Sequence, residues 1–170
     1  MPANSSALAK LVIEEAARLG MTVGTAESCT GGLVCAALTD VSGSSAAVRG
    51  GVVSYAAEVK QALLGVDHAV CSTAGLGVVS GICARQMSQG ARLALQCDVA
   101  VSTTGIAGPT GAEPGKPVGT VWFAVSSVHG THSVRRLLSG DRAEVRAQAV
   151  RVALSLLLEH LRFVDSRISN

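Results

Sequence analysis

Short segments rich in β-branched residues alternate along this chain with longer segments of helical periodicity, and this alternation constrains the fold more than any other feature. The strand-like segments are 21–27, 48–56 and 98–105, and the helical ones are 5–20, 31–41, 57–66, 78–97 and 141–161. Segments 118–127 and 132–139 follow each other across a tight turn at His129 and Gly130, which is typical of an antiparallel hairpin. The order predicts an α/β fold, a three-layer α/β/α sandwich around a mixed, mostly parallel sheet.

The length of 170 residues favours one domain. We expect this domain to cover residues 1–164, with 165–170 as a frayed tail. Aromatic side chains make up only 2% of the chain, so the core has to be built from Ala, Val, Leu and Ile. Such small side chains suit helices that pack closely on a sheet.

Charge and cysteine usage exclude several classes of protein. The net charge is +2 and the basic residues are scattered, so nucleic acid is not an expected partner. The five cysteines form no CxxC pair and lack metal-ligand spacing, which predicts free thiols, a reducing cytoplasm and no metal. The N-terminal segment interleaves charges with apolar residues, unlike a signal peptide, and no apolar run approaches the roughly 20 residues of a membrane span.

Three polar loops could carry a site, because ligands of such sheets gather where strands end and Gly-rich loops begin. They are Glu27–Gly32, Thr104–Pro117 and Ser139–Arg142. The first, in "AESCTGG", is either a plain turn into a helix or a cradle of backbone N–H groups for a phosphate or oxyanion. Ser28 and Cys29 are rival nucleophiles within it. Because all four histidines lie in unsuitable places, no partner for a thiolate is available, and we interpret Cys29 as a packing residue.

Without a histidine, the remaining base for a serine hydrolase is a lysine whose pKa is depressed by its surroundings. Lys60 follows the second strand-like segment, five residues after Tyr55, the only tyrosine. Ser45 precedes the same segment, so Ser45 and Lys60 are expected to converge on one edge of the sheet. The alternative interpretation is a solvated lysine on a helix. Thr104 offers a hydroxyl, and Arg142 offers a guanidinium for a phosphate.

Taken together, several stretches resemble the CinA C-terminal domain family, the nicotinamide mononucleotide deamidases. They are "TAESCTGG", "GSS", "Y-x-x-E-x-K" followed by "LLGV", "TGIAGPTG", "KPVGTVWFA" and "SGDR". They occur in the family's order and span about Thr25 to Arg146. The chain departs from the family's common pattern at Ala57, Gly81 and Gln86.

The resemblance implies a cytoplasmic amidohydrolase that converts nicotinamide mononucleotide to nicotinate mononucleotide and ammonia. It implies a Ser/Lys acyl-enzyme mechanism without metal or other cofactor, and a homo-oligomer, dimeric or larger. The residues carried over as catalytic are Ser45 as nucleophile, Lys60 as base, and Ser28 as proton relay or alternative nucleophile. Those carried over or expected around the substrate are Tyr55, Thr104, Arg142, Glu27, Thr30, Gly31, Gly105 and Gly108.

Two other functions stay open at this point. One is a non-catalytic nucleotide-binding module, suggested by the departures at Ala57 and Gly81. The other is an interaction domain associated with competence or DNA damage, suggested by the family's historical name.

Overall fold

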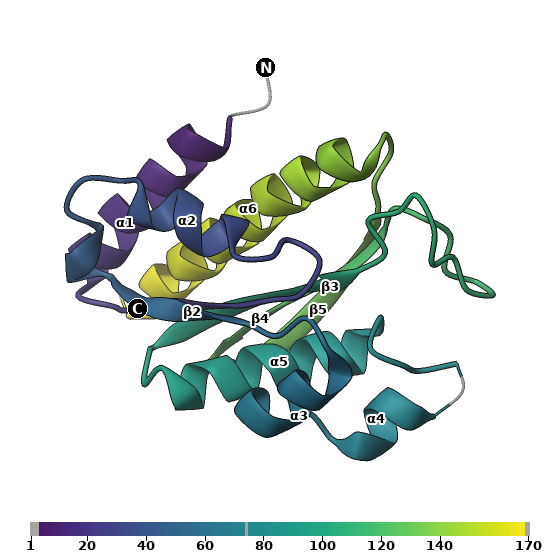
Figure 1. The fold of residues 1–170 in the computed structure, drawn as a ribbon. Coiled ribbons are helices and arrows are strands. Elements are labelled where there is room, and N and C mark those ends of the chain that lie inside the picture. Colours follow the sequence, from purple (N-terminus) through teal and green to yellow (C-terminus); the bar gives the residue numbers. More distant parts are fainter. Residues whose placement is uncertain (1–3, 74, 169–170) are drawn as a thin grey trace.

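Five strands form one sheet between two layers of helices in the computed structural model, which describes residues 4–73 and 75–168 (Figure 1). The strands are β1 (Val23–Glu27), β2 (Val48–Val53), β3 (Val99–Gly105), β4 (Thr120–Ser127) and β5 (Gly130–Leu137). They lie in the order β2-β1-β3-β4-β5. β1 pairs in parallel with β2 and β3, whereas β4 is antiparallel to both β3 and β5. All strands except β4 therefore run in one direction, which confirms the mixed, mostly parallel sheet.

The helices cover both faces of this sheet (Figure 1). On one face lie α1 (Ser5–Leu19), α2 (Leu33–Thr39) and α6 (Arg142–Ile168), and on the other lie α3 (Ala57–Leu64), α4 (His68–Ser72) and α5 (Gly81–Ala94). The predicted α/β/α sandwich is thus confirmed. The sequence patterns did not predict α4 or a short 3₁₀ helix at Ser44–Ala46, because a single turn is too short to show a helical period.

Two hydrophobic clusters, one on each face, hold the layers together. The larger joins α1, α2 and α6 to the sheet, and the smaller joins α3, α4 and α5 to it. Small side chains let the layers approach closely, as the low aromatic content predicts. At Gly90 in α5, a Cβ atom would collide with the Leu64 carbonyl at the end of α3. Only glycine allows this approach between the two helices.

The last helix is longer than the sequence pattern predicts. We expected a frayed tail from Asp165, but α6 continues through Ile168. Asp165 forms a 2.7 Å ion pair with Arg18 of α1, and the Arg167 guanidinium lies 5.0 Å from the centre of the Phe163 ring. These contacts give the last turn partners that a helical period alone does not reveal, and residues 169 and 170 lie outside the described residues.

The parallel strands end together and so bring separate loops to one edge of the sheet. The register pairs Glu27, the last residue of β1, with Val53 on β2 and with Thr103 on β3. The segments that follow β1, β2 and β3 therefore leave the sheet at the same edge. This edge carries the candidate site.

Candidate active site

The buried carboxylate of Glu27 organises the turn that follows β1. Glu27 is 1% exposed, and its two oxygens accept hydrogen bonds from the backbone N–H groups of Gly32, Val34 and Cys35 at distances of 2.8–3.0 Å. The hydroxyls of Thr25 and Thr30 donate to the same carboxylate. A negative group at the start of α2 also interacts favourably with the helix dipole. Glu27 thus fixes the path of residues 28–35.

This arrangement corrects part of the expected substrate site. The amides at the start of α2 were expected to bind substrate, yet Gly32, Val34 and Cys35 donate to Glu27. The Gly31 N–H donates to the Ser28 carbonyl. Thr30 is fully buried, and its hydroxyl lies 2.7 Å from both Glu27 and Thr103. Glu27, Thr30 and Gly31 therefore support the site, because a buried carboxylate has to take the nearest donors for itself.

Glu27→Gln is expected to lower the free energy of unfolding by about 3 kcal/mol, since an amide offers one acceptor oxygen and turns its NH₂ toward donors. Urea denaturation measures this loss. Glu14→Gln is the matched control, because the Glu14 side chain is 57% exposed and forms only a surface pair with Lys10. An equal effect of both substitutions would show that the carboxylate of Glu27 does not organise this turn.

Lys60 of α3 is fully buried, and its ammonium nitrogen reaches the end of β1. Nζ lies 3.0 Å from Ser28 Oγ, 2.6 Å from the Ser54 carbonyl oxygen and 3.0 Å from the Tyr55 carbonyl oxygen. Within the described residues no carboxylate forms an ion pair with it. Burial lowers the pKa of Lys60 below its ordinary value. The solvated lysine considered from sequence is thereby excluded.

The three contacts of Lys60 suit a general base. A neutral amine has two N–H donors and one lone pair. The ammonium form of Lys60 donates to the Ser54 carbonyl, the Tyr55 carbonyl and Ser28 Oγ. In the neutral form the two carbonyls can take both N–H donors, which would leave the lone pair for the Ser28 hydroxyl. Ser28 itself is 8% exposed and is held in place by its own N–H, which donates to the Thr103 carbonyl. A serine hydroxyl and a buried amine are thus within hydrogen-bond reach of each other on rigid supports, as a serine nucleophile and its base would need to be.

Cys29, the rival nucleophile, is unsuited to the role. Its side chain is 6% exposed and belongs to the larger hydrophobic cluster. Burial is the main cause that raises the pKa of its thiol to about 11, so the thiol stays protonated near neutral pH. No histidine lines the pocket around Ser28. The interpretation of Cys29 as a packing residue fits this position.

The structure does not bring Ser45 to Lys60. Ser45 is exposed and lies in the short 3₁₀ helix that precedes β2, whereas Lys60 contacts the carbonyls that follow β2. β2 spans six residues, so its ends are about 16 Å apart. The expected convergence is therefore wrong within one chain. Both residues flank the same strand in sequence, but a strand separates its two ends.

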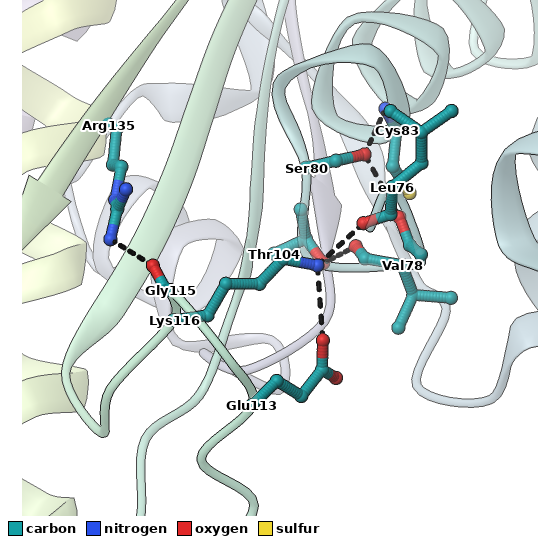
Figure 2. Close-up of polar contacts among 10 residues, drawn as sticks. Leu76, Val78, Ser80, Cys83, Thr104, Glu113, Gly115, Lys116 and Arg135 are labelled. Atoms are coloured by element: carbon teal, nitrogen blue, oxygen red, sulfur yellow. Dashed lines mark hydrogen bonds and ion pairs between the residues drawn. The ribbon is translucent and has the colours of Figure 1, made fainter. Parts of the chain in front are cut away.

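A pocket of about 190 Å³ opens over Ser28. The expected residues Tyr55, Thr104, Gly105 and Arg142 line it, together with Cys29, Val78, Val79 and Ala107. The Thr104 hydroxyl donates to the Val78 carbonyl at 2.6 Å, so it fixes the wall of the pocket (Figure 2). Arg142 donates to the Tyr55 hydroxyl at 3.2 Å and to the Gly108 carbonyl at 2.9 Å. Loops that leave β1, β2, β3 and β5 thus meet at one point.

Arg146 also supports the candidate site, and the sequence patterns did not identify it. It lies one turn after Arg142 in α6, and it donates to the Cys29 carbonyl at 3.1 Å and the Thr30 carbonyl at 3.0 Å. These bonds hold the turn at Ser28 from the side of α6. The four-residue spacing in "DRAEVR" was the available signal, since residues i and i+4 share one face of a helix.

A wider cleft of about 660 Å³ adjoins the pocket and shares Ala107 and Arg142 with it. Pro109, Val118, Gly140 and Arg146 also line this cleft. The cleft extends to the start of α6, where Asp141 and Glu144 exchange the two hydrogen bonds of a capping box. The site therefore has a small inner part at Ser28 and an open outer part with two arginines.

Residues 4–73 and 75–168 contain no group of three or more His, Cys, Asp or Glu side chains placed to hold a metal ion. None of their helices combines the length and apolar character needed to cross a membrane.

Comparison with known proteins places this geometry in context. The CinA C-terminal domain model matches residues 5–161. A CinA-like protein from Gemmatimonas aurantiaca is 45% identical over 150 residues, which cover 88% of this chain and 35% of that protein. The nicotinamide-nucleotide amidohydrolase PncC of Escherichia coli K12 is 48% identical over 139 residues, covering 81% of this chain and 83% of the enzyme. The chain thus spans about a third of its longer CinA-like relatives and most of the shorter one.

Solved structures agree with the sequence comparison. A CinA superfamily protein from Klebsiella pneumoniae superposes with a TM-score of 0.90 at 36% identity, covering 95% of this chain and 99% of that one. A competence/damage-inducible protein from Agrobacterium tumefaciens gives a TM-score of 0.89 at 40% identity, covering 95% and 98%.

Proposed function

The chain belongs to the CinA C-terminal domain family, and from that premise we propose that it hydrolyses the carboxamide of nicotinamide mononucleotide to give nicotinate mononucleotide and ammonia. The observation that carries the proposal is the 3.0 Å contact between Ser28 Oγ and Nζ of the fully buried Lys60. The relative named nicotinamide-nucleotide amidohydrolase, at 48% identity, supports the choice of substrate.

In the proposed reaction Ser28 is the nucleophile and Lys60 is the general base. Neutral Lys60 takes the hydroxyl proton as Ser28 Oγ forms a bond to the carboxamide carbon. The ammonium of Lys60 then returns that proton to the amide nitrogen, and the C–N bond breaks to release ammonia. A water molecule attacks the resulting ester, with Lys60 again accepting the proton. The acid leaves, and the Ser28 hydroxyl is restored.

Backbone N–H groups beside Ser28 are the proposed donors to the oxyanion. The amides of Cys29 and Ala107 donate to no other residue among those described, and both residues line the pocket. The residue after a nucleophile at a strand-to-helix turn commonly serves in this way. Each such donor contributes roughly 3 kcal/mol to lowering the barrier.

The outer cleft would hold the ribosyl phosphate. Arg142 lines both the inner pocket and the cleft, so its guanidinium can pair with a phosphate while the ring lies near Ser28. Tyr55 positions that guanidinium through its hydroxyl, and its own side chain is 63% exposed at the mouth of the pocket.

The decisive experiment is a measurement of ammonia and nicotinate mononucleotide released from nicotinamide mononucleotide by the purified protein. Release that depends on Ser28 and Lys60 supports the proposal. Binding of the nucleotide without release would favour a non-catalytic nucleotide-binding module instead.

Arg142→Gln is expected to raise KM for nicotinamide mononucleotide about tenfold with a smaller change in kcat, because a charge-assisted bond to the phosphate is lost. The substitution should leave KM for free nicotinamide, which has no phosphate, almost unchanged. Arg151→Gln on the same helix is the control, as Arg151 lines neither the pocket nor the cleft. A similar rise of KM for both substrates would argue against a phosphate contact.

A further inference from the structure

A further cavity, of about 480 Å³, lies next to the Ser28 pocket and shares only Val79 with it. Its charged lining residues are Arg85, Lys116 and Arg135, and no acidic residue lines it. We propose that this cavity binds a phosphorylated small molecule of mononucleotide size at a site separate from the catalytic pocket. The proposal does not depend on the chemistry at Ser28.

Two of the cations converge because of the sheet register. Trp122 of β4 pairs directly with Arg135 of β5, so both side chains point to the face that α5 covers. Ser133, two residues before Arg135, is on that same face and accepts a 2.8 Å hydrogen bond from Arg85 of α5. The two guanidinium groups are therefore brought to one cavity beside the indole of Trp122.

The third cation comes from the loop between β3 and β4. Lys116 is only 13% exposed, and Nζ donates to the Leu76 carbonyl at 2.6 Å while it pairs with Glu113 at 3.1 Å. Figure 2 shows Lys116 between these two partners, with Arg135 donating to the Gly115 carbonyl at 2.9 Å. Of these three cations only Lys116 pairs with a carboxylate among the described residues, and that carboxylate is 51% exposed.

Both arginines of the cavity have N–H donors that are available to a ligand. Arg85 and Arg135 each make a single side-chain hydrogen bond, to Ser133 and to Gly115, and neither forms an ion pair among the described residues. A guanidinium has five N–H donors in a planar fork that matches phosphate oxygens. Like charges gathered without matching acids are stabilised when an anion binds between them.

The remaining walls suit the non-phosphate part of a ligand. Trp122 is half-buried and gives the cavity a flat apolar surface. Gly81 of α5 lets the indole lie close to the helix, since a Cβ atom there would lie 2.8 Å from the ring. An aromatic base can lie against an indole while its phosphate reaches the arginines. The cavity volume falls in the range of small-molecule sites.

Trp122 allows a direct test, because it is the only tryptophan in the chain. Its fluorescence, excited at 295 nm so that the base does not absorb, is followed during titration with adenosine 5′-monophosphate. Ribose 5-phosphate and adenosine are titrated separately. We expect saturable quenching with the mononucleotide, weaker binding of ribose 5-phosphate and the weakest binding of adenosine.

Arg135→Gln is expected to weaken binding of the mononucleotide about tenfold. Arg136→Gln is the matched control, because neighbouring residues of a strand face opposite sides and Arg136 does not line the cavity. Absence of saturable quenching, or equal weakening by both substitutions, would overturn the proposal. A rise of KM for nicotinamide mononucleotide in Arg135→Gln alone would also overturn it, since the cavity would then be an extension of the substrate cleft.

Discussion

Ser28→Ala is expected to lower kcat for nicotinamide mononucleotide by about 10³-fold or more, whereas Ser45→Ala keeps kcat within about twofold of the parent protein. The reason is the position of each hydroxyl relative to Lys60, the proposed base. Ser28 Oγ lies 3.0 Å from Lys60 Nζ, and Ser45 is exposed beyond the opposite end of β2. Release of ammonia under saturating substrate measures the difference between the two variants.

Each variant also needs a folding control. Far-UV circular dichroism and urea denaturation show whether Ser28→Ala keeps the native structure. The reverse result, an inactive Ser45→Ala protein beside an active Ser28→Ala protein, would return the nucleophile to Ser45 and require that another subunit supply the neighbouring groups.

A trapped intermediate distinguishes nucleophile from relay. Rapid quenching in acid during turnover should preserve an ester of nicotinate mononucleotide, and peptide mass spectrometry should locate its added mass on the peptide that contains Ser28. A modified Ser45 peptide would contradict the mechanism. Trypsin leaves both serines on one peptide, residues 19–49, because no Lys or Arg lies between them. Cleavage on the N-terminal side of Asp40 with endoproteinase Asp-N places Ser28 and Ser45 on separate peptides.

The fold was largely predictable because its information is local. Strand and helix periodicities can be recognised in short stretches of sequence. The hairpin of β4 and β5 can be recognised from a tight turn between two strand-like segments. The parts of the fold that the sequence did not predict depend on packing contacts between residues far apart in the chain. The continuation of α6 past Asp165 accompanies an ion pair with Arg18, far away in the sequence.

The sequence predicted which loops form the candidate site, but it predicted less well which atoms contact one another there. The three polar loops meet at the predicted edge, yet the roles within "AESCTGG" depend on Glu27, whose carboxylate takes the amides expected for substrate. The Ser54 and Tyr55 carbonyls that orient Lys60 are backbone groups, which no residue type reveals. The prediction that Ser45 lies near Lys60 was also wrong, because the two residues flank the same strand and the length of that strand separates them.

The pH dependence of kcat/KM is expected to follow the proton of Lys60. Only the neutral amine can accept the Ser28 proton, so kcat/KM should rise about tenfold per pH unit until pH reaches the pKa of Lys60. Burial lowers this pKa below the ordinary value of 10.5, so the rise should level off below that pH. Measurements above pH 7 avoid the second ionisation of the substrate phosphate, whose pKa is about 6.

Lys60→Met removes the titrating group while it keeps an unbranched side chain in the cavity. We expect kcat/KM to fall by about 10²- to 10⁴-fold, the usual contribution of a general base, and the remaining activity to lose its rise with pH in this range. Lys10→Met is the matched control, because that side chain is 69% exposed on α1 and should alter neither the rate nor the profile. A pH profile of Lys60→Met that still rises as in the parent would assign the ionisation to another group. Because a structural role of Lys60 would reduce activity equally at every pH, the shape of the profile separates a base from a support.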